Sequence, residues 1–221
     1  MANASTTGFG LRAVMTVGNT PATSGQTEYL IKTAQGVATN KGDPMSFNDG
    51  GATAGEAGMV QDASFTTTDD GGNGGTAWTT ANSALLLGVF NGAFYINASG
   101  KPTFQNNIVA AQTTSVDYNT GSNDILAFIN DNPLQEYVVK ADAALAQTLI
   151  GVNPMQGFNT NNYTATANLS GQSITTLDVG SAATTAMFTA VRSANDPENR
   201  DKTVAGSNWV VVAAPASALF N

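Results

Sequence analysis

Short apolar and β-branched runs, each followed by residues that favour turns, recur along most of the chain. Runs of four to eight such residues bounded by Gly, Asn, Pro or Ser are typical of β-strands. They predict strands within residues 11–17, 28–33, 36–47, 85–96, 101–104, 125–129, 137–140, 165–169, 174–179, 186–191 and 209–212. This spacing is typical of an all-β domain of the small barrel or sandwich type, and a β-tulip-like arrangement fits the same pattern.

The strongest local signal is the apolar run 85–96, which two glycines interrupt. A turn sequence at 97–100 follows and leads into residues 101–104, so this region predicts a buried β-hairpin with bulges. The earlier run 36–47 predicts two strands joined by a tight turn in a β-meander. Pro44 is then expected to start an edge strand, because proline lacks the N–H that a central strand needs.

Three segments depart from this strand pattern. Residues 1–10 carry too little apolar surface to offset their ordering entropy, so we expect an extended N-terminal arm. The segment 48–81 has few large side chains and many glycines, which predicts a long, mobile loop. Residues 142–149 have helical propensity, although a single turn or a strand fits them equally well.

The domain organisation follows from these segments. We expect an arm at residues 1–10 and a β-rich domain with long loops at residues 11–221. The domain is either one unit or two subdomains that meet near residues 105–123, and the pattern of strands leaves both arrangements open.

Composition narrows the chemistry. The 221 residues include neither His nor Cys, so an imidazole base, a thiol nucleophile, a disulfide and the usual structural zinc site are excluded. We expect no enzyme activity, no cofactor and no metal. Ala, Thr, Gly and Asn make up 109 of the residues and only 11% are charged, a composition that suits extended structure and turns.

Charge is unevenly placed along the chain. The net charge is −8, with +2 in residues 1–41, −9 in residues 42–142 and −1 in residues 143–221. An acidic body repels phosphate, so we expect no nucleic-acid partner. We also expect no membrane partner, because no run approaches roughly 20 apolar residues. The N-terminus does not resemble a signal peptide, so we expect the protein to be made in a cytoplasm.

Two motifs suggest chemistry, and each also has a structural interpretation. The run Gly8-Phe9-Gly10-Leu11-Arg12-Ala13 matches part of a dinucleotide-binding pattern but has no strand before it, so we interpret its glycines as a flexible hinge. Asp124, Asp131 and Glu136 are the best candidates for the paired acids of a glycosidase. The sequence 130–133 is, however, a turn in which Asp typically bonds nearby backbone amides, and we favour that role.

The densest charged cluster is residues 196–201. Its carboxylates are the hard oxygen ligands that calcium prefers, but their spacing is not that of a known calcium loop. A solvated loop with local ion pairs is the interpretation we favour.

Six segments together carry a resemblance to a known family. They are NASTTGFGLR at 3–12, GVATNKGDP at 36–44, LGVFNGAFY at 87–95, AFINDNP at 127–133, YVVKAD at 137–142 and RSANDPEN at 192–199. In this order they are similar to segments of structural proteins of marine tailed phages, namely capsid decoration, or cement, proteins. None of the six is a catalytic motif.

The resemblance implies a non-enzymatic virion protein that binds the exterior of an icosahedral capsid and bridges subunits of the major capsid protein. It also implies a homotrimer near local threefold axes and an N-terminal arm that reaches a neighbouring subunit. Arg12 and Lys32 would then face acidic residues of the shell. The capsid-binding residues implied for the arm are Asn3, Thr6, Thr7, Phe9, Leu11 and Arg12.

Other classes of protein fit the same sequence. A phage tail or fibre component, or a receptor-binding β domain, shares the composition and the lack of catalytic motifs. Hundreds of copies in the virion would indicate the shell, and a few dozen or fewer would indicate the tail. A carbohydrate-active enzyme would need a working acid pair such as Asp131 and Glu136, and a secreted or surface-layer protein would need a signal peptide.

Overall fold

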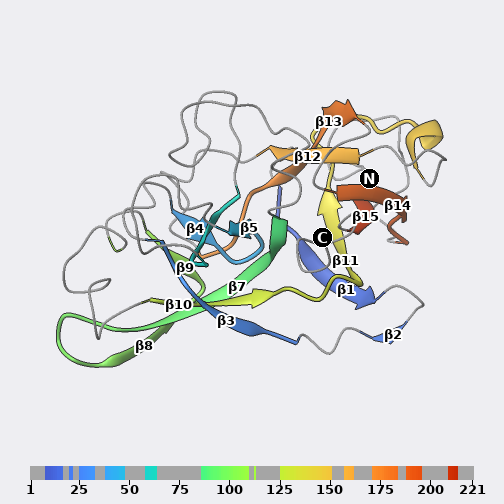
Figure 1. Cartoon of the computed structure of the whole chain (residues 1–221). Helices are drawn as coiled ribbons and strands as arrows, with labels where there is room; N and C mark the ends of the chain where they lie inside the picture. The colour runs from blue at the N-terminus through green and yellow to red at the C-terminus, as the bar shows by residue number, and fades with distance from the viewer. Residues whose placement is uncertain are drawn as a thin grey trace.

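The computed structural model describes residues 8–16, 20–21, 25–32, 38–47, 58–63, 86–109, 112, 125–150, 157–161, 171–183, 188–195 and 209–213. Of these residues, 61% lie in β-strands and none lies in a helix of seven or more residues. The strands form antiparallel sheets, which confirms the prediction of an all-β, sandwich-type domain (Figure 1). In the described part of the chain, no helix has the length and hydrophobicity needed to cross a membrane.

The larger sheet joins the start of the chain to its C-terminal half. Its strands are β1 (Arg12–Thr16), β2 (Thr20–Pro21), β11 (Gln135–Lys140), β12 (Gly157–Asn161), β13 (Thr176–Ala183), β14 (Phe188–Ser193) and β15 (Trp209–Ala213). They are ordered β13-β12-β14-β15-β11-β1-β2. Strand β1 therefore pairs with β11, although more than a hundred residues separate them.

The second sheet has six strands. They are β3 (Thr27–Leu30), β5 (Pro44–Phe47), β6 (Val60–Asp62), β7 (Leu86–Ile96), β8 (Pro102–Gln105) and β10 (Leu126–Asn130). Five are ordered β3-β10-β7-β5-β6, and β8 pairs with the far end of β7. The short strands β4 (Thr39–Asn40) and β9 (Asn107–Ile108) form a separate pair, and a 3-10 turn spans Gln147–Leu149.

Two hydrophobic clusters pack against β7, the longest strand. Leu86 and Val89 belong to the cluster that includes Tyr137 of β11, whereas Leu87 and Phe90 belong to the cluster that includes Ile108 of β9. Side chains of a strand alternate between its two faces, and a register shift between β5 and β7 accommodates the extra residue between Leu86 and Val89. The second sheet is thus buried on both faces around β7.

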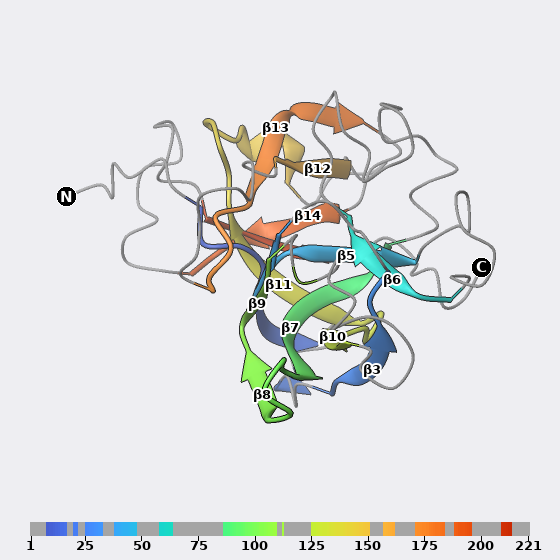
Figure 2. The ribbon, with the colours of Figure 1, turned by 90° about the vertical axis from the view of Figure 1, so that its left-hand side faces the viewer.

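The predicted hairpin at 85–104 is confirmed as β7 and β8 (Figure 2). Its turn is stabilised by the Asn97 side chain, whose Oδ1 accepts hydrogen bonds from the backbone N–H groups of Ser99 and Lys101, both at 3.0 Å. Strand β7 is buried, but β8 is largely exposed. The bulges lie where β7 pairs with β5 and β10 rather than within the hairpin.

The prediction of a meander at 36–47 is wrong. Strand β4 pairs with β9, whereas β5 pairs with β6 and β7, so the two strands diverge after the turn at Gly42. The divergence has a local cause, because Gly42 donates its N–H to Phe90 O at 2.8 Å and adopts a φ of 101°. Pro44 also starts an internal strand rather than an edge strand, which proline tolerates as the first residue of a strand.

Part of the segment predicted as a long loop is ordered. Residues 58–63 contain β6, which pairs with β5 and buries Val60 completely. The rest of 48–81 lies outside the described residues, as does the strand predicted at 165–169.

Both large sheets take strands from either side of residues 105–123, so the strand pairing does not divide the domain at that point.

Candidate interaction surface

The residues that lead into β1 pack inside the domain. The N–H groups of Gly10 and Leu11 donate to Thr175 O and Gly42 O at 3.2 and 2.9 Å. The Gln172 side chain donates from Nε2 to Phe9 O at 2.8 Å. Residues 8–10, predicted as part of the arm, are therefore anchored to the domain. Of the predicted arm residues, Asn3, Thr6 and Thr7 lie outside the described part of the chain.

Close backbone packing explains the two glycines of this segment. A Cβ atom on Gly8 would lie 2.2 Å from Ile174 O, and one on Gly10 would lie 2.5 Å from Ser173 Cβ. Gly10 also adopts a φ of 74°, which side chains disfavour. The prediction of a flexible hinge at these glycines is therefore wrong, because the backbone is held on both sides.

The other residues predicted to bind the capsid have different environments. Leu11 is 3% exposed and belongs to the core, so its side chain is not available to a partner. Arg12 is exposed, and its guanidinium carbon lies 4.3 Å from the centre of the half-buried Phe9 ring, in a cation–π contact. Lys32, which like Arg12 was expected to face acidic residues of the shell, follows β3 of the second sheet, and its Nζ donates to Gln61 Oε1 at 3.3 Å.

Phe9 and Arg12 border a surface hollow of about 380 Å³, here called the β1–β14 groove. Val138 and Val211 line it, whereas their neighbours Tyr137 and Val212 belong to the core on the opposite face of the sheet. The groove therefore lies on the outer face. Its complete lining is Phe9, Arg12, Val14, Met15, Val138, Arg192, Ala194, Asn195 and Val211.

A bidentate ion pair holds the second arginine of the groove. Arg192 donates from Nη1 to Glu136 Oε1 at 2.9 Å and from Nη2 to Glu136 Oε2 at 2.5 Å. The Glu136 side chain is 6% exposed and that of Arg192 is 42% exposed. The hydrogen bonds to Glu136 raise the pKa of Arg192. The buried carboxylate thus fixes a permanent cation at the edge of the groove.

Sequence reasoning did not identify Arg192. The two partners are 56 residues apart, and β15 lies between their strands in the sheet. No local pattern signals a contact that depends on the order of three strands.

The two carboxylates proposed as a catalytic pair each have a separate partner. Glu136 binds Arg192, and Asp131 Oδ2 accepts a hydrogen bond from Tyr29 Oη at 2.7 Å. Burial, together with this hydrogen bond, raises the pKa of Tyr29 to about 12. Asp124 and the cluster 196–201 lie outside the described residues, and among the residues described no group of three or more Asp or Glu could hold a metal ion.

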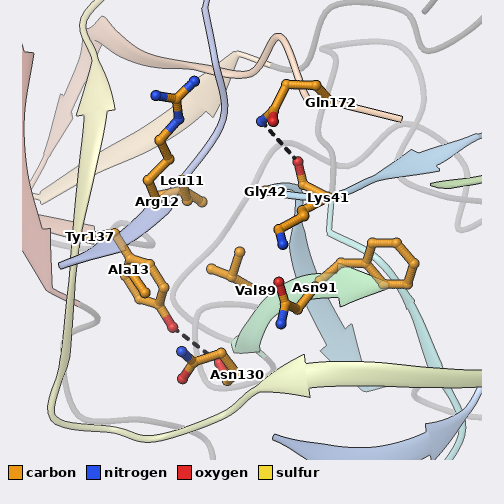
Figure 3. Close-up of a pocket in the computed structure, with 11 residues that line it drawn as sticks. Leu11, Arg12, Ala13, Lys41, Gly42, Val89, Asn91, Asn130, Tyr137 and Gln172 are labelled. Carbon is orange, nitrogen blue, oxygen red and sulfur yellow. Dashed lines mark hydrogen bonds between the residues drawn. The ribbon is translucent and has the colours of Figure 1, made fainter. Parts of the chain in front are cut away.

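A second hollow, of about 280 Å³, lies where β1, β7 and β11 meet (Figure 3). Tyr137 Oη donates to Asn130 O at 3.0 Å, and Gln172 Nε2 donates to Lys41 O at 3.3 Å. The first hydrogen bond joins residues seven apart in the sequence, whereas the second joins residues 131 apart. One buried acceptor, Asn130 Oδ1, has no hydrogen-bond partner among the residues that the structure describes.

Beside this hollow, Asp43 is only 1% exposed. It accepts hydrogen bonds from Asn40 N at 2.7 Å and from Thr175 Oγ1 at 2.9 Å, and a third from the Ser173 hydroxyl. Burial raises the pKa of Asp43, and the hydrogen bonds oppose this shift. The network joins the turn before β5 to the segment before β13. Sequence analysis predicted only a tight turn within residues 36–47 and did not predict this network.

The described residues define an all-β sandwich protein whose β1–β14 groove combines an apolar floor with two arginines. Comparisons with protein-family models, curated proteins and solved structures found no match.

Proposed function

We propose that this protein is a non-enzymatic virion protein that binds the exterior of a tailed-phage icosahedral capsid. It stabilises the shell by bridging subunits of the major capsid protein. The resemblance of the six sequence segments supports this partner, and the β1–β14 groove is the observation that carries the proposed binding surface. On a chain of net charge −8, an apolar floor bordered by Arg12 and Arg192 is suited to an acidic protein surface.

Both arginines are held before a partner arrives. Glu136 fixes Arg192 through two hydrogen bonds, and the Phe9 ring packs against Arg12. Side chains that are already ordered lose less entropy on binding, so more of the interaction energy is retained in the complex. Carboxylates of the shell would pair with the two guanidinium groups while the valines of the groove exclude water.

The groove is too small to be the whole interface. Stable protein interfaces bury about 800 Å² on each partner. We propose that residues 1–7, which precede Phe9 of the groove in the sequence, extend the contact by adding main-chain hydrogen bonds to an exposed strand of the shell. A homotrimer near a local threefold axis would make three such contacts with the shell. These contacts would have to break before the shell opens.

Co-sedimentation with undecorated phage heads tests the proposal. The wild-type protein should saturate the heads at hundreds of copies and raise their rupture temperature. Arg12→Ala should weaken binding about tenfold, because it removes an exposed cation from the groove. Lys101→Ala, which removes an exposed cation from the β7–β8 turn, is the matched control and should bind like the wild type. Equal binding by the two variants would contradict the assignment of the groove.

Deleting residues 2–7 tests the arm separately. The deletion keeps the hydrogen bonds of Phe9, Gly10 and Leu11, so the domain should remain folded while binding to heads weakens. A longer deletion through residue 10 would also remove contacts inside the domain and would confuse the two effects. A 2–7 deletion protein that decorates heads as tightly as the full chain would exclude a role for the arm.

A phage tail or receptor-binding β domain is the alternative. The observation that favours it is Phe104, a large apolar side chain that is 72% exposed far along the chain from β1. The two functions are distinguished by what the purified protein binds, because a tail or receptor-binding domain would ignore heads and bind tails or cell surfaces.

A further inference from the structure

Three phenylalanines form an aromatic platform on the second sheet, and one of them, Phe104, is exposed. Phe94 of β7, Phe104 of β8 and Phe128 of β10 lie on neighbouring strands. The Phe104 ring centre lies 4.8 Å from that of Phe94 and 6.2 Å from that of Phe128, and the Phe104 and Phe128 planes differ by only 16°. An exposed Phe at the centre of such a group indicates a binding surface.

A hollow of about 210 Å³ adjoins the platform. Gly92 lies opposite Phe128 in the sheet, and because it has no side chain it leaves the space between β8 and β10 open. A Cβ atom there would lie 3.2 Å from Gln105 O, and the φ of 152° also disfavours a side chain. The complete lining is Asn91, Gly92, Ala93, Phe104, Gln105, Asn106 and Phe128.

The polar groups of this hollow are all amides. Gln105 Oε1 accepts a hydrogen bond from Gln112 Nε2 at 3.3 Å, which orients its amide. In the part of the chain that the structure describes, the side chains of Asn91 and Asn106 have no hydrogen-bond partner. An amide offers both a donor and an acceptor, which is what a sugar hydroxyl also offers. No ionisable side chain lines the hollow.

We propose that the aromatic platform and its amides bind neutral carbohydrate. The C–H bonds on one face of a pyranose ring carry a partial positive charge and would pack on the negative face of the Phe104 ring. Hydroxyl groups at the edge of the sugar would hydrogen-bond to Asn91, Gln105 and Asn106. The absence of charge in the lining selects an uncharged sugar over an acidic one.

The size of the surface favours a sugar over a protein partner or a second copy of the chain. Of the three rings only Phe104 is exposed, and a whole Phe side chain contributes about 150–250 Å². A stable protein interface needs about 800 Å² on each side, so the platform is several times too small. One or two sugar rings match its extent.

This site goes beyond the proposed capsid function and does not depend on it. Strand β8 lies apart from β14 in both views of the molecule (Figures 1 and 2). Sugar binding at β8 and capsid binding at the β1–β14 groove would therefore not compete, and a failure of one leaves the other standing.

Titration of the full chain with neutral tetrasaccharides, followed through backbone amide NMR signals, tests the proposal. Four probes of different linkage are used: cellotetraose, maltotetraose, laminaritetraose and chitotetraose. At least one should cause saturable shifts in residues 91–94, 103–106 and 126–128, with a Kd of about 1 mM or tighter.

Variants assign the binding to the platform. Phe104→Ala should weaken binding at least tenfold, and the exposure of Phe104 means that the fold survives the change. Asn106→Ala should weaken it less. Leu134→Ala is the matched control, because Leu134 is 56% exposed in the turn between β10 and β11, and it should bind like the wild type.

Three results would overturn the proposal. The first is the absence of saturable shifts with all four sugars at about 10 mM, a concentration that detects even weak complexes. The second is unchanged sugar binding by Phe104→Ala. The third is an oligomer, seen by light scattering, that Phe104→Ala dissociates while no sugar binds, which would make the platform a contact between copies of this chain.

Discussion

Asp43 and Glu136 are both buried carboxylates, but their partners differ. In the part of the chain that the structure describes, the hydrogen bonds to Asp43 come from neutral groups, namely the backbone N–H and side-chain amide of Asn40 and the hydroxyls of Ser173 and Thr175. Glu136 receives two hydrogen bonds from Arg192, whose side chain reaches the surface. One carboxylate therefore connects parts of the interior, and the other fixes a cation at the β1–β14 groove.

The difference shows why burial alone does not identify a functional carboxylate. At Asp43 desolvation outweighs the hydrogen bonds from neutral groups and raises the pKa, so the network contributes structure and no chemistry at the surface. At Glu136 the counter-charge is present, and the pair places a guanidinium where a partner can reach it. Changes at Asp43 should affect stability alone, whereas changes at Glu136 should affect stability and binding.

The largest effect is expected for Asp43→Ala. Removing the carboxylate leaves the Asn40 N–H and the hydroxyls of Ser173 and Thr175 without their acceptor, which should lower the free energy of unfolding by about 3–5 kcal/mol. Urea denaturation measures the change. Asp131→Ala, which removes one hydrogen bond from Tyr29, should cost only about 1 kcal/mol. A loss below about 1 kcal/mol for Asp43→Ala would show that its network does not hold the sheets together.

The next effect is expected for Glu136→Gln. The neutral amide breaks the charge pair with Arg192, and the free energy of unfolding should fall by about 2 kcal/mol, since Arg192 is partly solvated. Binding to phage heads should also weaken, because the guanidinium is no longer fixed. If stability falls while head binding stays at the wild-type level, the groove is not the capsid-binding surface.

The free energy of unfolding should depend on pH differently in the wild type and in Asp43→Asn, whose side chain cannot ionise. The raised pKa means that folded Asp43 keeps its proton at a pH where the unfolded chain has lost it. Its contribution is therefore complete below the unfolded pKa near 3.8 and is lost as the pH rises through the folded pKa. The difference in unfolding free energy between the wild type and Asp43→Asn should narrow as the pH rises above the unfolded pKa, as urea titrations at several pH values would show. A constant difference would mean that Asp43 ionises normally.

The smallest effect is expected for Tyr29→Phe at high pH. Folded Tyr29 has a pKa of about 12 against an ordinary value of 10.0, so its contribution is present below pH 10.0 and is lost as the pH rises to about 12. Wild-type stability should therefore fall more steeply than that of Tyr29→Phe in this range. Thermal unfolding of both proteins across this interval is the measurement, and parallel curves would contradict the role of the Tyr29–Asp131 hydrogen bond.

Local patterns predicted most of the strands that the structure describes. The hairpin of β7 and β8 is an example, because its turn is stabilised by Asn97 within five residues of sequence. Strand β6 was missed, since three residues among glycines carry little signal and are ordered by pairing with β5.

The candidate sites were harder to predict because they depend on distant contacts. Asp43 and Ser173 are 130 residues apart, and Glu136 meets Arg192 only because β15 separates β11 from β14. The aromatic platform likewise requires the register that places Phe104 beside Phe94. Residue types could be named from the sequence, but their neighbours follow from strand order, which local propensity does not specify.

Electron cryo-microscopy of phage heads incubated with the purified protein would show whether the protein binds the shell and through which face. We expect regular protrusions on the shell exterior, with the outer face of the larger sheet and the β1–β14 groove against the shell and with the β7–β8 hairpin pointing away from it. Bare heads at saturating protein, or protrusions attached through the β7–β8 hairpin, would contradict this expectation.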